Sequence, residues 1–457
     1  ITGVLEALGL RRAAQPREAD IMLLNTCSIR EKAAQKIFTR LGQLKRFKVN
    51  RPHMVIGVCG CVAQQEQERI FARAPFVDLV LGPRKIPSLP DLIRQSRARQ
   101  HALGVFDPRD RLVPEVENVR RVSRTRAYIT VMEGCDKSCS FCIVPLTRGR
   151  EACRAPDAIL REVAGCVQGG LPEIELLGQN VNAWRYRGEG GWNFSRLLGE
   201  VARVPGVRRL RFTTSHPLHL RDEIIEVMGS HETICRFLHL PAQSGSDRIL
   251  KSMRRGYTRS RYLDRIRRLR GRMPDIALST DIIVGFPGET DDDFAATLDL
   301  LREVRFDSVY SFIYSPRPGT PAAEMDDRVP PEEKKERLRR LQSIQDEIQL
   351  ERNVRWVGRV VEVLVDGPSA RGAGQLQGRI SQHVPVNFDG EPSLVGRFAR
   401  VLVESAGRHS LRGRLHPDET ALDLSLSTEY NSNRDSSASA FPGSPGGGKP
   451  SSRHGGL

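Results

Sequence analysis

The feature that most constrains this fold is a repeated alternation of short apolar runs and helical stretches between residues 119 and 352. Six candidate strands recur there: Ala127–Met132, Glu173–Leu177, Arg208–Thr213, Arg236–Leu240, Ala277–Val284 and Ser308–Ile313. Helical segments separate them, which is the pattern of repeated βα units. We therefore predict a closed or partly closed parallel barrel whose binding face lies at the carboxyl ends of its strands.

An α/β pattern also precedes this segment. Ile21–Asn25 and Met54–Val58 are expected to be buried parallel strands, and each one is closely followed by a cysteine. The intervening residues 28–48 are expected to form a helix with Ser28 near its N-cap and Glu31 at capping-box spacing. These patterns predict a Rossmann-like amino-terminal domain.

A different pattern follows the barrel. A charged helix is expected from Pro330 to about Arg352, and an apolar stripe on it indicates a connector packed on one side. Short β runs separated by Gly and Pro turns then predict a small all-β barrel. These runs lie at residues 359–365, 375–380, 385–388 and 398–406. The predicted organisation has four parts. Residues 1–118 form an incomplete amino-terminal domain, and residues 119–352 form the central barrel. Residues 353–416 form an RNA-binding barrel, and residues 417–457 form a disordered low-complexity tail.

Three of the nine cysteines form a C-x3-C-x2-C triplet, Cys135, Cys139 and Cys142, directly after the first predicted barrel strand. Three thiolates in so short a loop can ligate three irons of a [4Fe–4S] cluster and leave the fourth iron open to a substrate or cofactor. Zinc is the competing interpretation, but no second C-x2-C unit or histidine pair completes a zinc site. Polar or Gly-rich loops follow other strands and are expected on the same face.

The chain is strongly basic, with 71 Lys and Arg against 55 Asp and Glu and a net charge of +16. Arginine grips phosphate with two donors, which favours a nucleic-acid partner, although a GC-rich genome would give the same arginine excess. No apolar stretch is long enough for a transmembrane helix, and we expect a cytoplasmic protein. The basic residues of the carboxy-terminal barrel are Arg355, Arg359, Arg371, Arg379, Arg397, Arg400, Arg408, Arg412 and Arg414.

Several motifs together resemble one family, the bacterial tRNA methylthiotransferases of the MiaB type, which are radical S-adenosylmethionine (SAM) enzymes. The resemblance runs from residue 1 to about 416, and residues 356–415 resemble the RNA-binding TRAM barrel of these enzymes. Besides the cysteine triplet, the matching segments are Asn25–Ala33, Gly60–Gln64, Thr147–Glu151, Leu177–Asn182, Phe212–Pro217, Leu238–Ser246 and Tyr314–Thr320.

The resemblance implies a reaction in which a C–H at carbon 2 of N6-(dimethylallyl)adenosine, at position 37 of certain tRNAs, becomes C–SCH₃. Such a C–H is not acidic, so a radical made from SAM at the open iron would be needed. We expect Gly178, Gln179, Gln243 and Gly285 to contact SAM. The expected partners are the tRNA anticodon stem-loop, a low-potential electron donor and a sulfur or cluster carrier, and the chain is expected to be a monomer.

The resemblance also implies an auxiliary [4Fe–4S] cluster with three cysteine ligands in the amino-terminal domain. Cys27 and Cys61 match two of them, and the first would lie upstream of residue 1. We therefore expect this cluster to be impaired or labile in the chain as given. Cys59 is expected to be a bystander that points away from Cys61, and Leu146 stands where aromatic residues are common in the family. Cys153, Cys166 and Cys235 match no ligand.

Two alternatives stay open at this point. The first keeps the chemistry but changes the target to threonylcarbamoyl-adenosine in tRNA or to a ribosomal protein. The Ser-Ile-Arg-Glu run after Cys27 and the basic barrel favour the dimethylallyl substrate. The second is a non-enzymatic iron–sulfur RNA-binding protein, which would release no 5′-deoxyadenosine from SAM.

Overall fold

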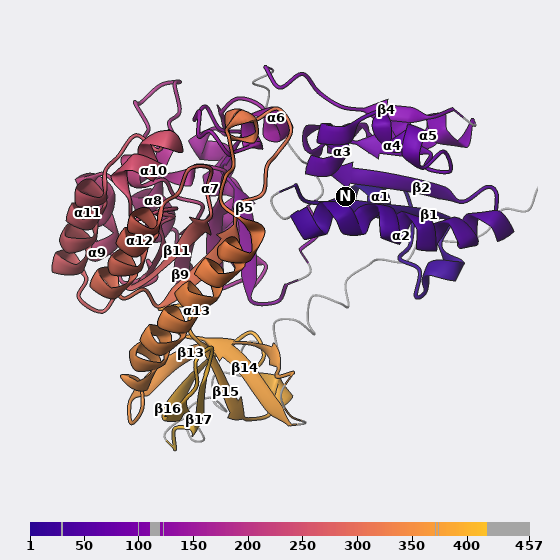
Figure 1. The fold of residues 1–457 in the computed structure, drawn as a ribbon. Coiled ribbons are helices and arrows are strands. Elements are labelled where there is room, and N and C mark those ends of the chain that lie inside the picture. Colours follow the sequence, from indigo (N-terminus) through magenta and orange to yellow (C-terminus); the bar gives the residue numbers. More distant parts are fainter. Residues whose placement is uncertain are drawn as a thin grey trace, which may run out of the picture.

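The computed structural model describes residues 1–28, 31–98, 100–109, 119–121, 123–370, 372 and 374–417. Within them the predicted fold class is confirmed. An α/β domain, a partial (β/α)6 barrel and a small all-β barrel follow one another along the chain (Figure 1). The exact domain boundaries stay predictions, and the low-complexity tail beyond Pro417 lies outside the described residues.

The amino-terminal domain is a four-stranded parallel sheet with helices on both faces. The two predicted strands are β1 (Ile21–Thr26) and β2 (Val55–Gly60), and β3 (Leu79–Leu81) and β4 (Ala102–Gly104) extend the sheet. The helices are α1 (Thr2–Ala7), α2 (Glu31–Asn50), α3 (Cys61–Glu66), α4 (Arg69–Arg73) and α5 (Leu89–Arg97).

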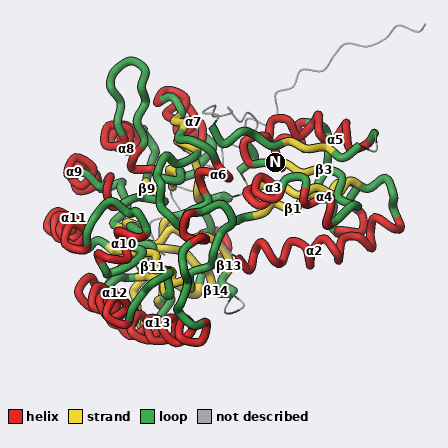
Figure 2. The backbone as a smooth tube through the Cα atoms, turned by 45° about the horizontal axis from the view of Figure 1, so that its top comes forward, coloured by secondary structure: helices red, strands yellow, loops and turns green. Residues whose placement is uncertain are grey.

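Side chains alternate between the two faces along each strand of this sheet, and apolar side chains on both faces explain why helices pack on each of them. Ile56 and Val58 pack with the apolar side of α2, which runs along one face (Figure 2). Val55 and Cys59 pack on the opposite face with α5. The predicted helix over residues 28–48 is therefore α2, whereas the side chain of Glu31 lies outside the described part.

All six predicted barrel strands are present. They form two parallel three-stranded sheets, which an isolated bridge between Leu210 and Ile234 joins. The first sheet contains β5 (Arg126–Thr130), β8 (Glu173–Leu177) and β9 (Arg209–Thr213). The second contains β10 (Phe237–His239), β11 (Ala277–Val284) and β12 (Ser308–Ile313). In the described residues β5 and β12 pair with no further strand, so the barrel is open between them.

Helices cover the outer face of the barrel, and polar residues line the inner face of several strands. Ile129, Ile174 and Leu210 belong to the large apolar core shared with the helices. Their strand neighbours Glu173 and Arg211 are also buried, and they form an ion pair at 3.2 Å. The helices are α7 (Pro156–Gln168), α8 (Phe194–Arg203), α9 (Asp222–Ser230), α10 (Asp247–Ser252), α11 (Arg259–Arg272) and α12 (Asp291–Val304).

The predicted connector helix is α13 (Pro331–Val354), which packs against β12 and α12. Leu341 and Ile348 of its apolar stripe are buried, and Leu338 and Ile344 are partly buried beside them. Arg337 adds a buried ion pair with Glu289 at 2.8 Å. Within the described ranges, no helix is both long enough and apolar enough to cross a membrane.

A closed five-stranded barrel follows α13, in the order β13-β14-β15-β17-β16. Four strands were expected, and the fifth, β17, was missed. The strands are β13 (Val360–Pro368), β14 (Gln375–Arg379), β15 (Pro385–Asp389), β16 (Phe398–Ala406) and β17 (Leu411–Leu415).

Two arginines of β9 hold this barrel against the central one. Arg209 donates to the carbonyl oxygens of Arg379 and Glu362, at 2.6 and 2.8 Å. Arg211 donates to the carbonyls of Ser381 and Ile380, at 2.9 and 3.0 Å. The loop after β14 therefore lies against the inner, polar side of β9.

Candidate active site

The three cysteines of the triplet lie in a loop at the carboxyl end of β5, as the barrel pattern predicts. The loop follows the short strand β6 (Met132–Glu133), which pairs with β7 (Ala152–Cys153), and it leads into α6 (Val144–Arg148). Gly134 has a positive φ of 79°, and a Cβ there would lie 2.1 Å from the carbonyl oxygen of Arg150. Glycine is therefore required where the loop begins.

Backbone and carboxylate contacts fix the first half of the loop. The amide of Cys135 donates to the Gly149 carbonyl at 3.1 Å, and Asp136 Oδ1 accepts from Arg150 Nε at 2.8 Å. Gln179 Oε1 accepts from the Gly134 amide at 2.6 Å. The segment 147–151 that resembles the family motif thus positions the first cysteine.

The second half is tied to the end of α10 through Ser140. Its amide donates to the Met253 carbonyl at 3.1 Å, and its hydroxyl donates to the Ser252 carbonyl at 2.8 Å. The Ser140 carbonyl accepts from the Ala322 amide at 2.8 Å. Since Ser140 is fully buried, these contacts hold the backbone between Cys139 and Cys142 in one place.

The thiols of the triplet are near one another in a dry environment. Cys139 and Cys142 lie close enough to Cys135 to oppose its ionisation, and Cys139 has the same effect on Cys142. Desolvation by burial raises the pKa of Cys135 to about 12 and that of Cys142 to about 11. Because a ligating thiol must be deprotonated, metal binding here would release protons. In the part of the chain that the structure describes, no three metal-ligating side chains converge on a single ion. A [4Fe–4S] cluster differs because it spreads its ligands over separate irons.

Arg255 is a site residue that the sequence pattern did not reveal. It lies just beyond the carboxyl end of α10 and donates from Nη1 to Cys139 Sγ at 3.4 Å. Nη2 donates to the Pro241 carbonyl at 3.0 Å, and Nε donates to the Tyr257 hydroxyl at 3.2 Å. No spacing rule links Arg255 to a cysteine 116 residues earlier, so only the fold brings the two together.

In the loops that follow β9 and β10, three buried polar atoms have no hydrogen-bond partner among the described atoms: Ser215 Oγ, His216 Nε2 and Gln243 Oε1. Burial, together with the electrostatic effects of Arg255, His219 and Lys137, lowers the pKa of His216 to about 2. His216 is therefore neutral. Buried polar atoms without partners are costly, and a ligand with amino and hydroxyl groups would satisfy them. The residues present fit SAM on this ground.

The four expected SAM contacts occupy different positions. Gln179 and Gly178 lie against the cysteine segment, since a Cβ on Gly178 would be 2.5 Å from Met132 Cγ. Gln243 presents its unpartnered Oε1. Gly285 instead faces α13, because its Cβ would lie 2.4 Å from Lys334 Cγ and its amide donates to Glu289 at 2.6 Å.

The two amino-terminal cysteines that resemble auxiliary-cluster ligands lie at the carboxyl ends of adjacent strands. Cys27 follows β1 and is exposed, and Cys61 begins α3 directly after β2. Cys59 lies in the apolar core of the sheet, where burial raises its pKa to about 12. Cys166 and Cys235 are also buried, and Cys153 is partly buried.

A charged contact connects these cysteines to the triplet. Helix α3 packs against α6, which directly follows the triplet loop (Figure 1). Arg148 of α6 donates from Nε to Cys61 Sγ at 3.3 Å and lies 3.6 Å from Glu133. Arg84 also lies 3.6 Å from Glu133 and donates to the Arg150 carbonyl at 2.7 Å. Both cysteine groups therefore border one interface.

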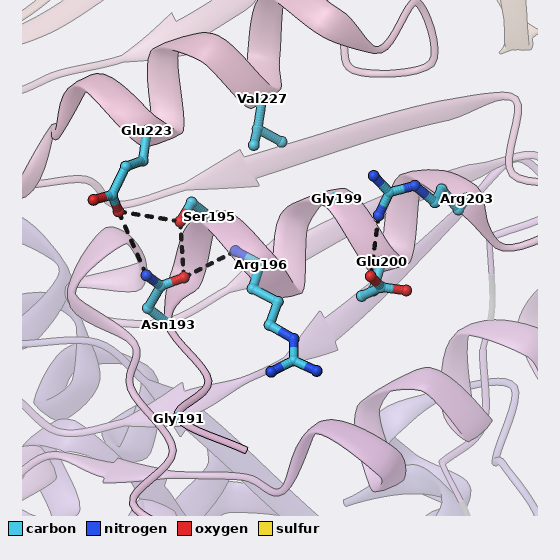
Figure 3. A pocket seen from close by; sticks show the side chains of 9 residues that line it. All are labelled: Gly191, Asn193, Ser195, Arg196, Gly199, Glu200, Arg203, Glu223 and Val227. Carbon is cyan, nitrogen blue, oxygen red and sulfur yellow. Dashed lines mark hydrogen bonds and ion pairs between the residues drawn. The ribbon is translucent and has the colours of Figure 1, made fainter.

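A groove of about 440 Å³ lies elsewhere, along the outer helices α8 and α9 (Figure 3). Its polar side chains mostly bond to one another: Asn193 Oδ1 caps α8 by accepting from the Arg196 amide at 2.9 Å and also accepts from Ser195 Oγ at 2.7 Å. It contains no expected site residue. The lining residues are Gly191, Asn193, Ser195, Arg196, Gly199, Glu200, Arg203, Glu223 and Val227.

Comparisons with solved structures support the barrel fold. The chain is similar to the radical S-adenosylmethionine methyltransferase TsrM from Kitasatospora setae, solved with tryptophan substrate and a SAM analog bound. The TM-score is 0.51 at 15% identity, over 70% of this chain and 66% of that one. A second TsrM structure, with cobalamin and a [4Fe–4S] cluster bound, matches with a TM-score of 0.50.

Family models match each of the three domains. Residues 129–301 match the radical SAM superfamily, residues 354–416 match the TRAM domain, and residues 1–82 match an uncharacterized protein family, UPF0004. The barrel with its cysteine loop therefore defines a radical SAM enzyme.

Comparison with individual relatives narrows the family further than the domain models do. The chain is 47% identical over 427 residues to a tRNA-2-methylthio-N(6)-dimethylallyladenosine synthase from Aeromonas salmonicida. The aligned region covers 92% of this chain and 88% of that protein. The chain is 45% identical over 418 residues to the protein of the same name from Syntrophotalea carbinolica, over 90% of this chain and 95% of that one. The chain belongs to the tRNA-2-methylthio-N(6)-dimethylallyladenosine synthase family.

Proposed function

We propose that this protein converts N6-(dimethylallyl)adenosine at position 37 of tRNA to its 2-methylthio derivative. The observation that carries the proposal is a C-x3-C-x2-C loop at the carboxyl face of a partial barrel, in a chain whose relatives with this name match over about nine tenths of its length. The names of these relatives do not favour threonylcarbamoyl-adenosine or a ribosomal protein as the target.

Cys135, Cys139 and Cys142 would hold one [4Fe–4S] cluster, and the unpartnered Gln243 Oε1, His216 Nε2 and Ser215 Oγ would contact SAM beside it. When bound, the cluster and SAM supply the one-electron chemistry that a non-acidic C–H bond requires. The protein's own contribution is positional: Gln179, Asp136 and Ser140 fix the loop, and the buried surroundings exclude water.

Cys27 and Cys61 would be ligands of a second cluster, which would present sulfur to the base. Support comes from their place at the carboxyl ends of adjacent strands and from the contact between Cys61 and Arg148. Arg148 and Glu133 would keep the two cysteine groups at a fixed separation across the interface of α3 and α6.

The partners follow from the chemistry. The TRAM barrel would bind the tRNA anticodon stem-loop through its arginines, a low-potential donor would supply electrons, and a carrier would supply sulfur or clusters. Since tRNA is the substrate, we place the protein in the cytoplasm, and we expect a monomer.

The test is an anaerobic assay with reconstituted protein, dithionite, SAM and tRNA that carries dimethylallyladenosine. Mass spectrometry of the digested tRNA should show the 2-methylthio nucleoside, and 5′-deoxyadenosine should be released. Cys139→Ala should abolish both products, whereas Cys166→Ala, at a buried cysteine outside the site, should retain them. If the wild-type protein releases no 5′-deoxyadenosine from SAM, or if C139A is fully active, the proposal is contradicted.

A further inference from the structure

Arg255 differs from every other buried arginine that the structure describes. All four of the other buried arginines have a glutamate within ion-pair distance. The pairs are Arg84 with Glu133, Arg209 with Glu362, Arg211 with Glu173, and Arg337 with Glu289. Arg255 is equally buried, yet in the described ranges no carboxylate lies within ion-pair distance of it. A buried charge without a counter-charge is strongly unfavourable, so a negative group is missing from its surroundings.

Arg255 contacts two groups that can ionise, the Tyr257 hydroxyl at 3.2 Å and Cys139, whose Sγ accepts from Arg255 Nη1 at 3.4 Å. Burial raises the pKa of Tyr257 and keeps it neutral, so Cys139 is the contact through which negative charge can reach the guanidinium. The other two hydrogen bonds of the guanidinium go to the neutral Pro241 carbonyl and the neutral Tyr257 hydroxyl. Tyr257 is held in turn, since its hydroxyl donates to the Ala242 carbonyl at 2.8 Å. Arg255 is therefore pointed at the cysteine loop by fixed partners.

The backbone around Arg255 is tied to the same loop. Ser252 and Met253, within three residues of Arg255, accept the two hydrogen bonds of Ser140, which is next to Cys139. Arg254 adopts the left-handed conformation at the end of α10, with φ of 56°, and thereby turns the following side chain inward. The position of the guanidinium relative to Sγ is thus set by the fold.

We propose that Arg255 is a positioning residue that supplies the counter-charge of the iron–sulfur cluster at Cys135, Cys139 and Cys142 and raises its reduction potential. This inference rests on the proposed function, which places a cluster there. A [4Fe–4S] cluster with thiolate ligands is anionic, and it gains one more negative charge on reduction. A cation and an N–H···S hydrogen bond stabilise the reduced form more than the oxidised form, and both set cluster potentials.

The experiment is a redox titration followed by electron paramagnetic resonance. It uses a background in which Cys27 and Cys61 are both alanine, so that one cluster gives the signal. For Arg255→Gln we expect the equilibrium constant for reduction to fall at least tenfold, which lowers the midpoint by about 59 mV. Arg255→Lys should lower it less, because its ammonium keeps the charge but cannot reach all three partners. Arg267→Gln, which removes an equal charge at an exposed position of α11, should have the wild-type midpoint.

The outcomes separate this inference from the proposed function. If the background protein binds no four-iron cluster and gives no signal, the proposed function fails. If both the background protein and its R255Q variant bind the cluster and have the same midpoint potential, the inference is overturned. If R255Q does not retain iron, R255K decides: a lowered midpoint supports the inference and a wild-type midpoint overturns it. Weaker SAM binding by R255Q without a shifted midpoint would assign Arg255 to SAM and would also overturn the inference.

Discussion

His383 shows how a single residue can couple the two barrels to pH. It lies in the loop after β14, stacks on Phe237 of β10 with ring centroids 4.8 Å apart, and has a positive φ of 67°. Its Nε2 accepts from Arg379 Nη1 at 3.0 Å, which requires a neutral imidazole. Burial, together with the positive charges of Arg211 and Arg379, lowers the pKa of His383 to about 2.

The low pKa predicts a loss of stability in mild acid. In the unfolded chain His383 binds a proton below about pH 6.5, whereas the folded state cannot bind it until about pH 2. Folding stability is therefore lost as the pH falls below about 6.5, by about 1.4 kcal/mol per pH unit for such a group. Between pH 7 and pH 5, the midpoint of thermal unfolding should fall less steeply in His383→Asn than in the wild type.

Asparagine is chosen because it tolerates the left-handed backbone. The control is His53→Asn at an exposed position. Parallel pH profiles for the wild type and H383N would contradict this account of His383.

At the residue scale, the sequence predicts candidate ligands but not their environment. The spacing of Cys135, Cys139 and Cys142 predicts a cluster loop by itself, since three thiols so close in sequence must be close in space. Arg255 and His383 gave no sequence signal, because each reaches its partner through tertiary contacts. Arg148 lies in the matching segment Thr147–Glu151, but nothing in the sequence links it to Cys61. Arginine is also so frequent in this chain that no single one stands out.

At the scale of elements, the junction of β2 and α3 places Cys61. Gly60 joins them with a φ of 95°, and a Cβ there would lie 2.4 Å from the Thr26 carbonyl oxygen. The close approach keeps the ends of β1 and β2 together, so the two cysteines that follow them stay adjacent. The junction is therefore part of the proposed auxiliary site as well as of the fold.

Gly60→Ala should destabilise the amino-terminal domain by about 1–3 kcal/mol, because both the backbone conformation and the close contact become unfavourable. Chemical unfolding followed by circular dichroism would measure the change. Gly42→Ala is the matched control: Gly42 is inside α2 with open space around its Cβ position, so this change should stabilise by about 0.5–1 kcal/mol. Equal unfolding midpoints for G60A and the wild type would refute the argument.

The elements that the sequence predicted are those with a clear period. Five of the six barrel strands and α13 were found because apolar residues recur regularly over five or more positions. The sixth, β10, has only three residues and was found through the longer run of residues 236–240 that contains it. Strands β3 and β4 have only three residues each, too few to show alternation. Strand β17 was missed because its charged residues Arg412 and Arg414 alternate with Leu411 and Gly413, and glycine adds no apolar signal.

At the scale of the whole molecule, the carboxy-terminal barrel is positioned by the central barrel and not only by the connector α13. Arg209 and Arg211 each donate to two backbone carbonyls of the small barrel. Hydrogen bonds from charged donors contribute about 1.5–3 kcal/mol each. Four such bonds hold the RNA-binding domain at one place relative to the cysteine face, so that a bound tRNA and the reacting face keep a fixed geometry.

Replacing both arginines with glutamine should loosen this attachment without changing the cysteine loop. Hydrogen–deuterium exchange of residues 375–389 should accelerate at least tenfold, and the KM for tRNA should rise. SAM cleavage in the absence of tRNA should keep its wild-type rate, because none of the loop contacts involves β9. The control is Arg203→Gln on the outer helix α8, where the side chain is exposed and pairs with Glu200. Unchanged exchange in R209Q/R211Q would show that α13 alone positions the barrel, whereas a parallel loss of tRNA-independent SAM cleavage would show that the two arginines act on the cysteine face itself.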